Sequence, residues 1–381
     1  MSKMRSGRIG DFFTLQRGFD ITKANQGVGS IPVISSSGIA SYHDVSMAKG
    51  PGVVIGRKGT LGTAFYVKTD YWPHDTSLWV KDFKDNCPEY VYYFLKSLPL
   101  EKLDSGSANP TLNRNVVHQL KASFPTPEAQ EEIAKILSTL DAKIELNQRM
   151  NEELEGMAKL LYDYWFVQHD FPMSAAQAQA LGKPKLAGHP YRASGGPMTY
   201  HETLKREIPT GWKGGTLEDV LTLQYGKALK KEHQVPGDYP VYGSGGIYGS
   251  HNTPLVAGPG IIVGRKGSVG ELHWSNLSFY PTDTSYYVEP KAGVDLNYMY
   301  FLLKRLPLKS MNSDSAVPGL SRIAAYQLPA TLPDKALIAE FGKFAAPLRA
   351  TIANNEQQTQ ELTTLRDWLL PMLMNGQVTV G

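Results

Sequence analysis

The sequence has a single cysteine, Cys87, and no run of about 18 apolar residues. The lone thiol excludes an internal disulfide and argues against a thiol-based metal site, and the 9 histidines show no paired ligand spacing. The missing apolar run excludes a membrane-spanning helix, and the N-terminus lacks the apolar core of a signal peptide. We therefore expect a cytoplasmic protein with no metal of its own.

A strong charge of either sign is also missing. The net charge is +3 and the isoelectric point is about 8.6. This balance permits a nucleic-acid partner but does not require one, because a nucleic-acid-binding domain is usually more basic. The length of 381 residues predicts two or three domains, and a hydrophobic share of 41% gives each of them enough apolar material for a core.

What the sequence does contain is a long internal repeat. The stretch PGVVIGRKGTLG at residues 51–62 returns as PGIIVGRKGSVG at residues 259–270, 208 positions later, with 7 of 12 residues identical. The same offset aligns Leu15-Gln16 with Leu223-Gln224, HDTS (residues 74–77) with TDTS (282–285), and SGSANPTLNR (105–114) with SDSAVPGLSR (313–322). The period is far too long for a solenoid, so it predicts two domains that arose by tandem duplication.

The first part of each repeat predicts a mixed α and β domain. Short β-branched and aromatic runs, such as IPVISSSG and GTAFYV, are broken by Gly, Pro, Ser and Asn, which is typical of strands joined by turns. Residues 89–98 and their counterparts 297–306 predict one helix in each repeat. The expected fold class is therefore α+β.

A long helix is predicted at the end of each repeat, since residues 128–171 contain no proline and few β-branched residues. Its seam positions recur at steps of four and three, as in a coiled coil: Ile133, Leu137, Leu140, Ile144, Asn147, Asn151, Leu154, Ala158, Leu161 and Trp165. Their counterparts keep most of the pattern, with one clear departure at Arg366: Phe341, Ala345, Leu348, Ile352, Asn355, Thr359, Leu362, Arg366, Leu369 and Leu373. Each helix would be about 55 Å long and needs a helical partner.

The expected partner of each long helix is the other copy. Two similar units that pack isologously are related by a pseudo-twofold axis, which makes the helices antiparallel. A buried Asn in a seam fixes the register, so we predict that Asn147 and its counterpart Asn355 face each other. The alternative is that both are solvated residues on partly frayed seams.

The repeated GRKG segment is not a phosphate-binding P-loop, because Lys58 and Lys266 are followed by glycine rather than by Ser or Thr. We interpret it as a hairpin with a strand at Val53–Ile55, a turn at residues 56–59 and a second strand from Thr60. The basic pair would then project from the tip, and with neighbouring hydroxyls would suit a phosphate backbone. The candidate DNA-binding residues of this segment are Arg57, Lys58, Thr60, Arg265, Lys266 and Ser268. The alternative is a plain turn with ordinary surface charges.

The shared acidic residues Asp75 and Asp283 are weak candidates for catalysis, because a single acid in each domain makes weak chemistry. Asp followed by Thr and Ser more often organises a turn. The signature of adenine methylation, Asn or Asp followed by Pro-Pro and an aromatic, is also missing, because Asn109 is followed by a single proline and its counterpart is Val317. We predict no catalytic residue in this chain.

The order of these features resembles the specificity subunits of Type I restriction-modification systems. The features are the GRKG hairpin, DTS, SGSANPTLN, the helix entry FPTPEAQEEIAKILSTLDAKIE, the second opening IPTGWKGGTLEDV and the closing LLPMLMNGQV. The entry of the second helix, LPDKALIAEFGKFAAPL, departs from the usual Glu-Gln pattern, and PEAQ keeps only Gln130.

The resemblance implies two pseudo-twofold-related α/β target recognition domains, residues 1–127 and 209–335, separated by two long antiparallel helices. The first helix would occupy residues 128–167, the second helix and a C-terminal tail residues 336–381, and the connection residues 168–208. Each domain would read half of a bipartite site in double-stranded DNA, and the chain would recruit two methyltransferase and two restriction subunits. The resemblance also implies S-adenosylmethionine, ATP and Mg²⁺ for those partners and no cofactor here. The alternatives are a free-standing DNA-binding regulator or decoy, and an enzyme with an unrecognised site.

Two matched segments that differ in part between the repeats supply candidates for sequence reading. SSSGIASYHD and GSGGIYGSHN diverge at several positions where polar side chains could meet base edges. The candidates there are Ser36, Tyr42, His43, Ser244, Ser250 and His251, and the shared pair Arg114 and Arg322 completes the predicted DNA-binding set.

Overall fold

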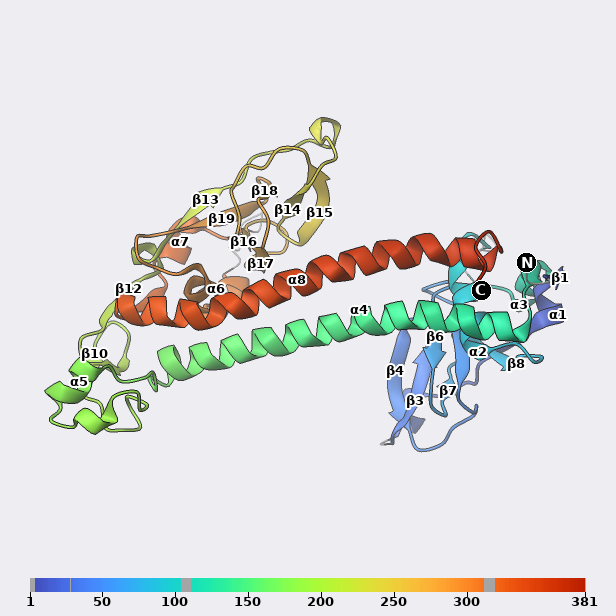
Figure 1. Cartoon of the computed structure of the whole chain (residues 1–381), viewed down its shortest axis with the longest axis horizontal. Coiled ribbons are helices and arrows are strands. Elements are labelled where there is room, and N and C mark those ends of the chain that lie inside the picture. Colours follow the sequence, from blue (N-terminus) through green and yellow to red (C-terminus); the bar gives the residue numbers. More distant parts are fainter. Residues whose placement is uncertain (1–3, 28, 104–110, 312–318, 381) are drawn as a thin grey trace. The chain divides into compact units, whose positions relative to one another are not determined.

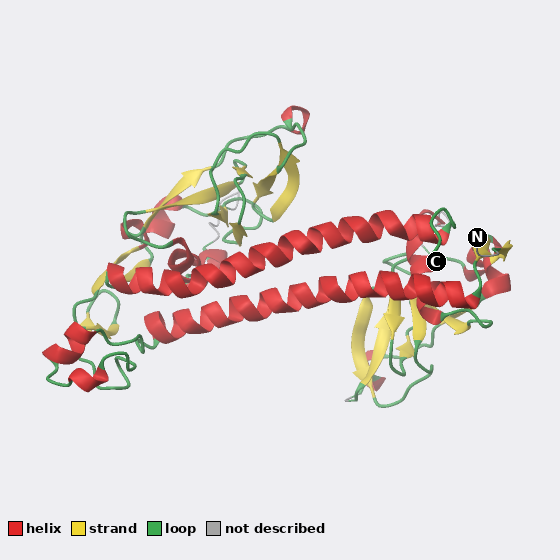
Figure 2. Ribbon diagram, viewed as in Figure 1, coloured by secondary structure: helices red, strands yellow, loops and turns green. Residues whose placement is uncertain are grey.

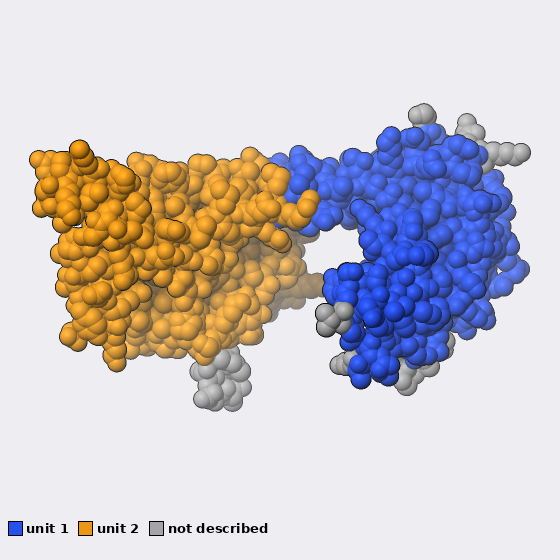
Figure 3. All heavy atoms as spheres, turned by 90° about the horizontal axis from the view of Figure 1, so that it is seen from below, with its two compact units in different colours: residues 1–148, 356–381 blue, residues 149–355 orange. Residues whose placement is uncertain are grey.

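The computed structural model describes residues 4–27, 29–103, 111–311 and 319–380 (Figure 1). The chain forms two compact units: unit 1 is residues 1–148 with 356–381, and unit 2 is residues 149–355 (Figure 3). Each unit holds the globular part of one repeat and segments of both long helices. Asn109 and Val317, compared above, lie outside the described residues.

The globular part of unit 1 combines small sheets with short helices (Figure 2). One four-stranded antiparallel sheet has the order β2-β8-β5-β6, a second sheet has the order β4-β3-β7, and β1 pairs with β9. The strands are β1 (Arg5–Arg8), β2 (Thr14–Arg17), β3 (Ile31–Ser35), β4 (Gly38–His43), β5 (Gly52–Gly56), β6 (Ala64–Val67), β7 (Trp72–Pro73), β8 (Ser77–Asp82) and β9 (Lys121–Phe124). The helices are α1 (Ile9–Phe12), α2 (Pro88–Ser97) and α3 (Arg114–Gln119).

Unit 2 repeats this topology, with the sheets β13-β19-β16-β17 and β15-β14-β18 and the pair β12-β20. The strands are β12 (Lys213–Thr216), β13 (Leu221–Tyr225), β14 (Tyr239–Gly243), β15 (Gly246–His251), β16 (Gly260–Gly264), β17 (Leu272–Ser275), β18 (Tyr280–Pro281), β19 (Ser285–Pro290) and β20 (Pro329–Leu332). Its helices are α6 (Leu296–Arg305) and α7 (Arg322–Tyr326), and the connection adds α5 (Ala175–Ala180), β10 (Met198–His201) and β11 (Arg206–Pro209). The predicted α+β class and the helices at 89–98 and 297–306 are confirmed by α2 and α6.

The two long helices are α4 (Pro127–Tyr162), which continues into a π-helical turn at Asp163–Val167, and α8 (Lys335–Met374). Every predicted seam position is buried or half-buried, including Leu137, Phe341 and Ala345 with 0% exposure. The seam prediction is confirmed. No helix in the described part of the chain is both long enough and apolar enough to cross a membrane.

Each long helix packs into a globular core as well as along the other helix. In unit 1, Ile133 and Leu137 of α4 and Leu373 of α8 join a core built on Phe12, Val53, Tyr90 and Phe124. In unit 2 the long helices contribute Tyr162, Trp165 and Phe341 to the corresponding core. They pack there with Ile261 and Val263 of β16 and with Phe301 of α6. Burial at these ends explains why neither helix needs to be apolar all round.

Pairs of contacts within each unit show that α4 and α8 run antiparallel there. In unit 1 these are Asp141–Arg366 and Asn147–Gln358, and in unit 2 they are Asn151–Asn355 and Tyr162–Phe341. In unit 1, Asn147 is fully buried and its side-chain amide donates to Gln358 Oε1 at 2.9 Å. In unit 2, the Asn355 amide donates to Asn151 Oδ1 at 2.8 Å. Both side chains thus bond across the helix pair, as a register-fixing role requires. The direct contact expected between Asn147 and Asn355 stays a prediction.

Arg366, the departure from the apolar seam, has a partner on the facing helix. Its Nη1 lies 2.7 Å from Asp141 Oδ1, and its side chain is only 17% exposed. The carboxylate also accepts a hydrogen bond from the Tyr93 hydroxyl at 2.9 Å. The counterpart of Asp141 in the second repeat is Arg349, whose guanidinium carbon lies 4.2 Å from the centroid of the Tyr300 ring. Positions 141 and 349 therefore carry opposite charges and make different contacts in the two copies.

Two glycines in the long helices are expected to respond to alanine substitution in opposite directions. A Cβ at Gly156 would meet nothing within 4 Å, so Gly156→Ala should stabilise the chain by about 1 kcal/mol because alanine loses less backbone entropy. A Cβ at Gly342 would lie 2.6 Å from Asp295 Oδ2, and Asp295 caps α6 by accepting from the Asn297 amide at 2.8 Å. Gly342→Ala should therefore destabilise. Urea unfolding of both variants checks the prediction, and two shifts of the same sign would contradict it.

Candidate nucleic-acid interface

In unit 1 the GRKG loop is fastened to the turn that precedes β8. The backbone amides of Arg57 and Lys58 both donate to the carbonyl of Thr76, at 2.9 and 3.0 Å. The Thr76 hydroxyl accepts from the amide of Ser36 at 3.4 Å, which brings in the turn of the β3–β4 hairpin. On the other side, the Leu112 amide donates to the Arg57 carbonyl at 2.9 Å. Four chain segments therefore meet at one edge of the domain.

Unit 2 reproduces this assembly bond for bond. The amides of Arg265 and Lys266 donate to the carbonyl of Thr284 at 2.9 and 3.1 Å, and the Thr284 hydroxyl accepts from the Ser244 amide at 3.3 Å. The Leu320 amide donates to the Arg265 carbonyl at 2.8 Å. The DTS segment thus organises the loop through its threonine, which agrees with the interpretation of Asp-Thr-Ser as a turn.

The glycines of the segment are required by its backbone geometry. A Cβ at Gly56 would lie 1.9 Å from the carbonyl oxygen of Thr60, and one at Gly264 would lie 2.0 Å from that of Ser268. Gly59 and Gly267 have φ values of 77° and 78°, in the left-handed region that disfavours residues with a Cβ. The repeat of these glycines is therefore explained by the loop itself.

The predicted hairpin is confirmed, but its predicted turn is wrong. β5 and β6 pair antiparallel, with Ile55 opposite Ala64, so the second strand begins at Ala64 and not at Thr60. The physical reason is that the amides of Arg57 and Lys58 bond to Thr76, outside the hairpin, and so cannot pair with β6. The connection is consequently a wide loop, in which Thr60 is exposed, as is Ser268 in unit 2.

The arginines do not project freely from the tip as expected. Arg57 is half-buried and its Nη1 donates to the Asp75 carbonyl at 3.3 Å, while Arg265 makes the same bond to Asp283 at 3.0 Å. Each guanidinium therefore ties its loop to the DTS turn and keeps its remaining N–H donors for other partners. Lys58 is exposed, and Lys266 is half-buried.

The charge around this loop differs between the units. In unit 2 the guanidinium carbons of Arg265 and Arg322 each lie 4.8 Å from the centroid of the Tyr225 ring, a contact that leaves their charges intact. In unit 1 the counterpart of Tyr225 is Arg17, which pairs with Asp20 at 2.7 Å and with Asp75 at 3.2 Å. Sequence reasoning missed this position, although it directly follows the shared Leu-Gln pair in both repeats.

The predicted base-reading residues are not all brought to the loop. The Ser244 side chain lies beside Gly267, and Ser36 occupies the same place in unit 1. The other candidates lie near the far end of each hairpin, where Tyr42 and His43 pair with Pro32 and Ile31, and Ser250 and His251 with Pro240 and Tyr239. At about 3.3 Å per residue, that end is on the order of 13 Å from the turn.

Several of these distant side chains have local partners. His43 Nδ1 lies 2.6 Å from Asp44 Oδ1, Ser250 Oγ accepts from the Gly237 amide at 3.3 Å, and His251 Nδ1 accepts from the Val235 amide at 3.2 Å. Tyr42 is 49% exposed. Arg114, at the first turn of α3, is exposed. Burial and, after it, the charge of Arg114 lower the pKa of His118, whose Nε2 accepts from the Leu15 amide at 2.9 Å.

The one shared acid with a histidine neighbour does not form a catalytic relay. In unit 1, His74 Nδ1 lies 2.9 Å from Asp75 Oδ1 and 3.0 Å from the Thr76 hydroxyl, so a single ring nitrogen serves both contacts. A relay needs one partner on each nitrogen. The counterpart of His74 in unit 2 is Thr282, so the arrangement is local to one copy.

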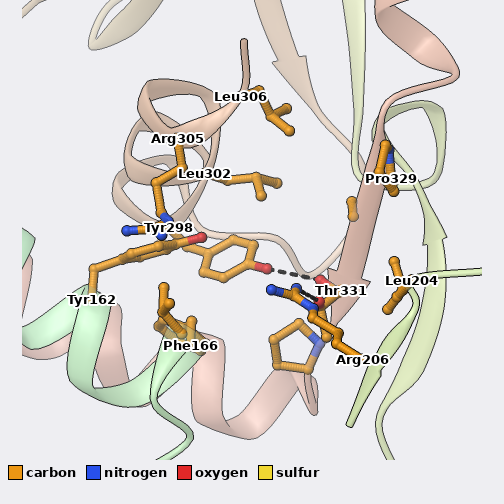
Figure 4. Close-up of a pocket in the computed structure, with 13 residues that line it drawn as sticks. Tyr162, Phe166, Leu204, Arg206, Tyr298, Leu302, Arg305, Leu306, Pro329 and Thr331 are labelled. Carbon is orange, nitrogen blue, oxygen red and sulfur yellow. Dashed lines mark hydrogen bonds between the residues drawn. The ribbon is translucent and has the colours of Figure 1, made fainter. Parts of the chain in front are cut away.

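A pocket of about 280 Å³ lies in unit 2, apart from the GRKG loop (Figure 4). The Tyr298 hydroxyl donates to the Thr331 carbonyl at 3.0 Å, and Arg206 donates to the Thr331 hydroxyl. The remaining lining side chains are aromatic or aliphatic, apart from Arg305. None of the lining residues is a carboxylate, a histidine or a cysteine. Burial raises the pKa of both lining tyrosines, Tyr162 and Tyr298, which makes them poor acid–base groups near neutral pH.

The two repeats thus form α+β domains of one topology that carry the same loop assembly. The family model of the Type I restriction modification DNA specificity domain matches residues 1–156 and 209–363, and the chain therefore belongs to this family. It is the DNA target-recognition subunit of a Type I restriction-modification system and is not itself an enzyme.

The chain is similar to the Type I restriction enzyme MjaIX specificity subunit of Methanocaldococcus jannaschii, with 24% identity over 77% of this chain and 69% of that one. It is also similar to the HindI specificity subunit of Haemophilus influenzae, with 23% identity over 71% of each chain. Among solved structures, the S subunit from M. genitalium has the same fold, with a TM-score of 0.67 and 20% identity over 98% of this chain and 96% of that one.

Proposed function

We propose that the chain reads a bipartite site in double-stranded DNA, with each unit binding one half-site. The observation that carries this proposal is the loop assembly that recurs bond for bond in units 1 and 2. The loop presents basic side chains and exposed hydroxyls, among them Lys58, Thr60 and Ser268. Such groups suit a phosphate backbone and fix the register of a domain on the duplex. In this proposal residues 1–127 and 209–335 are the target recognition domains, residues 128–167 and 336–381 are the helical spacer, and residues 168–208 connect them.

The proposal assigns the chemistry to partner subunits in the cytoplasm. Two methyltransferase subunits would methylate adenine with S-adenosylmethionine, and two restriction subunits would cleave DNA with ATP and Mg²⁺. The chain itself would hold none of these cofactors. Because the hairpin sequences of the two units differ, we expect two different half-sites separated by base pairs that are read weakly or not at all.

Methylation-site sequencing of genomic DNA, with and without the gene for this chain, tests the proposal. We expect a two-part adenine-methylation motif that disappears when the gene is deleted and returns when it is restored. An unchanged methylation pattern would contradict the assigned role. Copurification with a methyltransferase subunit separates this function from that of a free-standing DNA-binding regulator, and the purified chain with S-adenosylmethionine and DNA should transfer no methyl group.

A further inference from the structure

An isoleucine is exposed at the same place in both units. Ile39 in β4 is 59% exposed, and its counterpart Ile247 in β15 is 62% exposed. Single apolar residues on a surface are common and need no explanation. Here, however, the next three positions all differ between the copies, as Ala40-Ser41-Tyr42 and Tyr248-Gly249-Ser250, while the isoleucine is kept.

Both isoleucines lie next to the hairpin turn that meets the GRKG loop. Ile39 is the second residue of β4 and pairs with Ile34, while Ile247 is the second residue of β15 and pairs with Tyr242. The turn residue Ser36 bonds to Thr76, which also holds the amides of Arg57 and Lys58. Each isoleucine therefore lies beside a hairpin turn that is linked through one threonine to the basic loop that is proposed to contact phosphate.

β4 and β15 are the end strands of their three-stranded sheets, so the hairpin side of each sheet is the part that could enter a groove. The major groove of B-DNA is about 12 Å wide and admits a β-ribbon. The groove presents mostly polar base edges, and its apolar feature is the C5-methyl group of thymine. From this match, and on the basis of the proposed DNA-reading function, we infer that Ile39 and Ile247 each contact a thymine methyl group, one in each half-site. The differing neighbours would then select the other bases.

The test starts from half-sites selected by the full-length chain from a pool of random duplexes. Ile39→Ala is expected to lose the preference for one A·T pair in one half-site only, and Ile247→Ala for one in the other half-site. Leu277→Ala serves as the matched control, because Leu277 is 59% exposed but its counterpart is Thr69. The control should select the wild-type sequence.

Deoxyuridine in place of the thymine identifies the methyl group itself. Removing one buried methyl should weaken binding of the wild-type chain about fourfold and should leave the affinity of Ile39→Ala unchanged. An equal loss for both proteins would overturn the inference, as would half-sites without an A·T pair or alanine variants whose selected sequences match the wild type. If the wild-type chain selects no two-part sequence, the proposed function fails as well.

Discussion

A chain in which Arg57, Lys58, Arg265 and Lys266 are all replaced by alanine is expected to bind duplex DNA about a hundredfold more weakly at about 0.1 M salt. Each basic group that neutralises a phosphate releases condensed counterions, so the slope of log affinity against log salt concentration should also fall, by about 2 or more. The loss should be similar for cognate and non-cognate duplexes, because phosphate contacts carry no base identity. Fluorescence anisotropy over a salt series measures affinity and slope together.

Two further variants separate lost charge from lost structure. Lys58→Ala with Lys266→Ala removes charge without breaking the arginine bonds to Asp75 and Asp283, and it should still lower the affinity and the slope. Lys183→Ala with Lys185→Ala removes the same charge from exposed residues of the connection and should change the affinity little. If both double variants lowered the affinity equally, the loop lysines would contribute no more to DNA binding than any other exposed charge.

The sequence predicted well those features that depend on periodicity. The four-three spacing identified the helix seam because each step places a side chain on one face of a helix. Glycine spacing identified the β5–β6 hairpin for a similar reason, since Gly59 and Gly62 both have left-handed φ values. Features of this kind depend on residues that are close together in the sequence, so the sequence alone predicts them.

Features that depend on distant partners could not be predicted. The predicted turn at Arg57 and Lys58 was wrong because the backbone amides of both residues bond to the carbonyl of Thr76, which lies outside the hairpin. Arg366 looked like a break in the seam until its pairing with Asp141 was visible. Gln130, the one residue retained from the usual helix entry, is buried and joins the Cys87 amide, Asn86 and the Pro125 carbonyl.

The duplication itself supplied much of what single positions could not. Comparing repeats shows which residues belong to the shared loop and which differ between the two units. Arg17 and its counterpart Tyr225 are an example. Arg17 forms ion pairs with two carboxylates, whereas the Tyr225 ring lies against the guanidinium groups of Arg265 and Arg322. The shared scaffold can therefore present different charge to DNA at one place, which is what two unlike half-sites would require.

The stability of unit 2 is expected to fall by about 3 kcal/mol as the pH drops from about 6.5 to about 4, because of His169. This residue is 2% exposed, neither ring nitrogen has a hydrogen-bond partner among the described residues, and its ring meets Trp212 edge-on at 5.3 Å. Burial and, to a smaller extent, the charges of Arg206 and Arg192 together lower the pKa of His169 to about 4, against an opposing effect of Asp170.

The sign follows from proton binding. Between about pH 6.5 and about 4 the unfolded chain takes up a proton at His169 that the folded unit excludes, so acid favours unfolding in that window and has no effect through this residue above it. His169→Asn should flatten the response of unit 2, and asparagine tolerates the φ of 63° found at this position. His233→Asn, at an exposed residue, should leave the response unchanged.

Urea unfolding followed by tryptophan fluorescence measures this dependence, and its signal comes from both units, because three of the 6 tryptophans lie in each. The His118 pKa is also lowered, so unit 1 contributes a loss of the same sign that His169→Asn leaves in place. The quantity that decides is therefore the difference between the wild-type and His169→Asn stabilities at each pH. A difference that stays constant through the window would mean that water or a local opening of the connection solvates the imidazole.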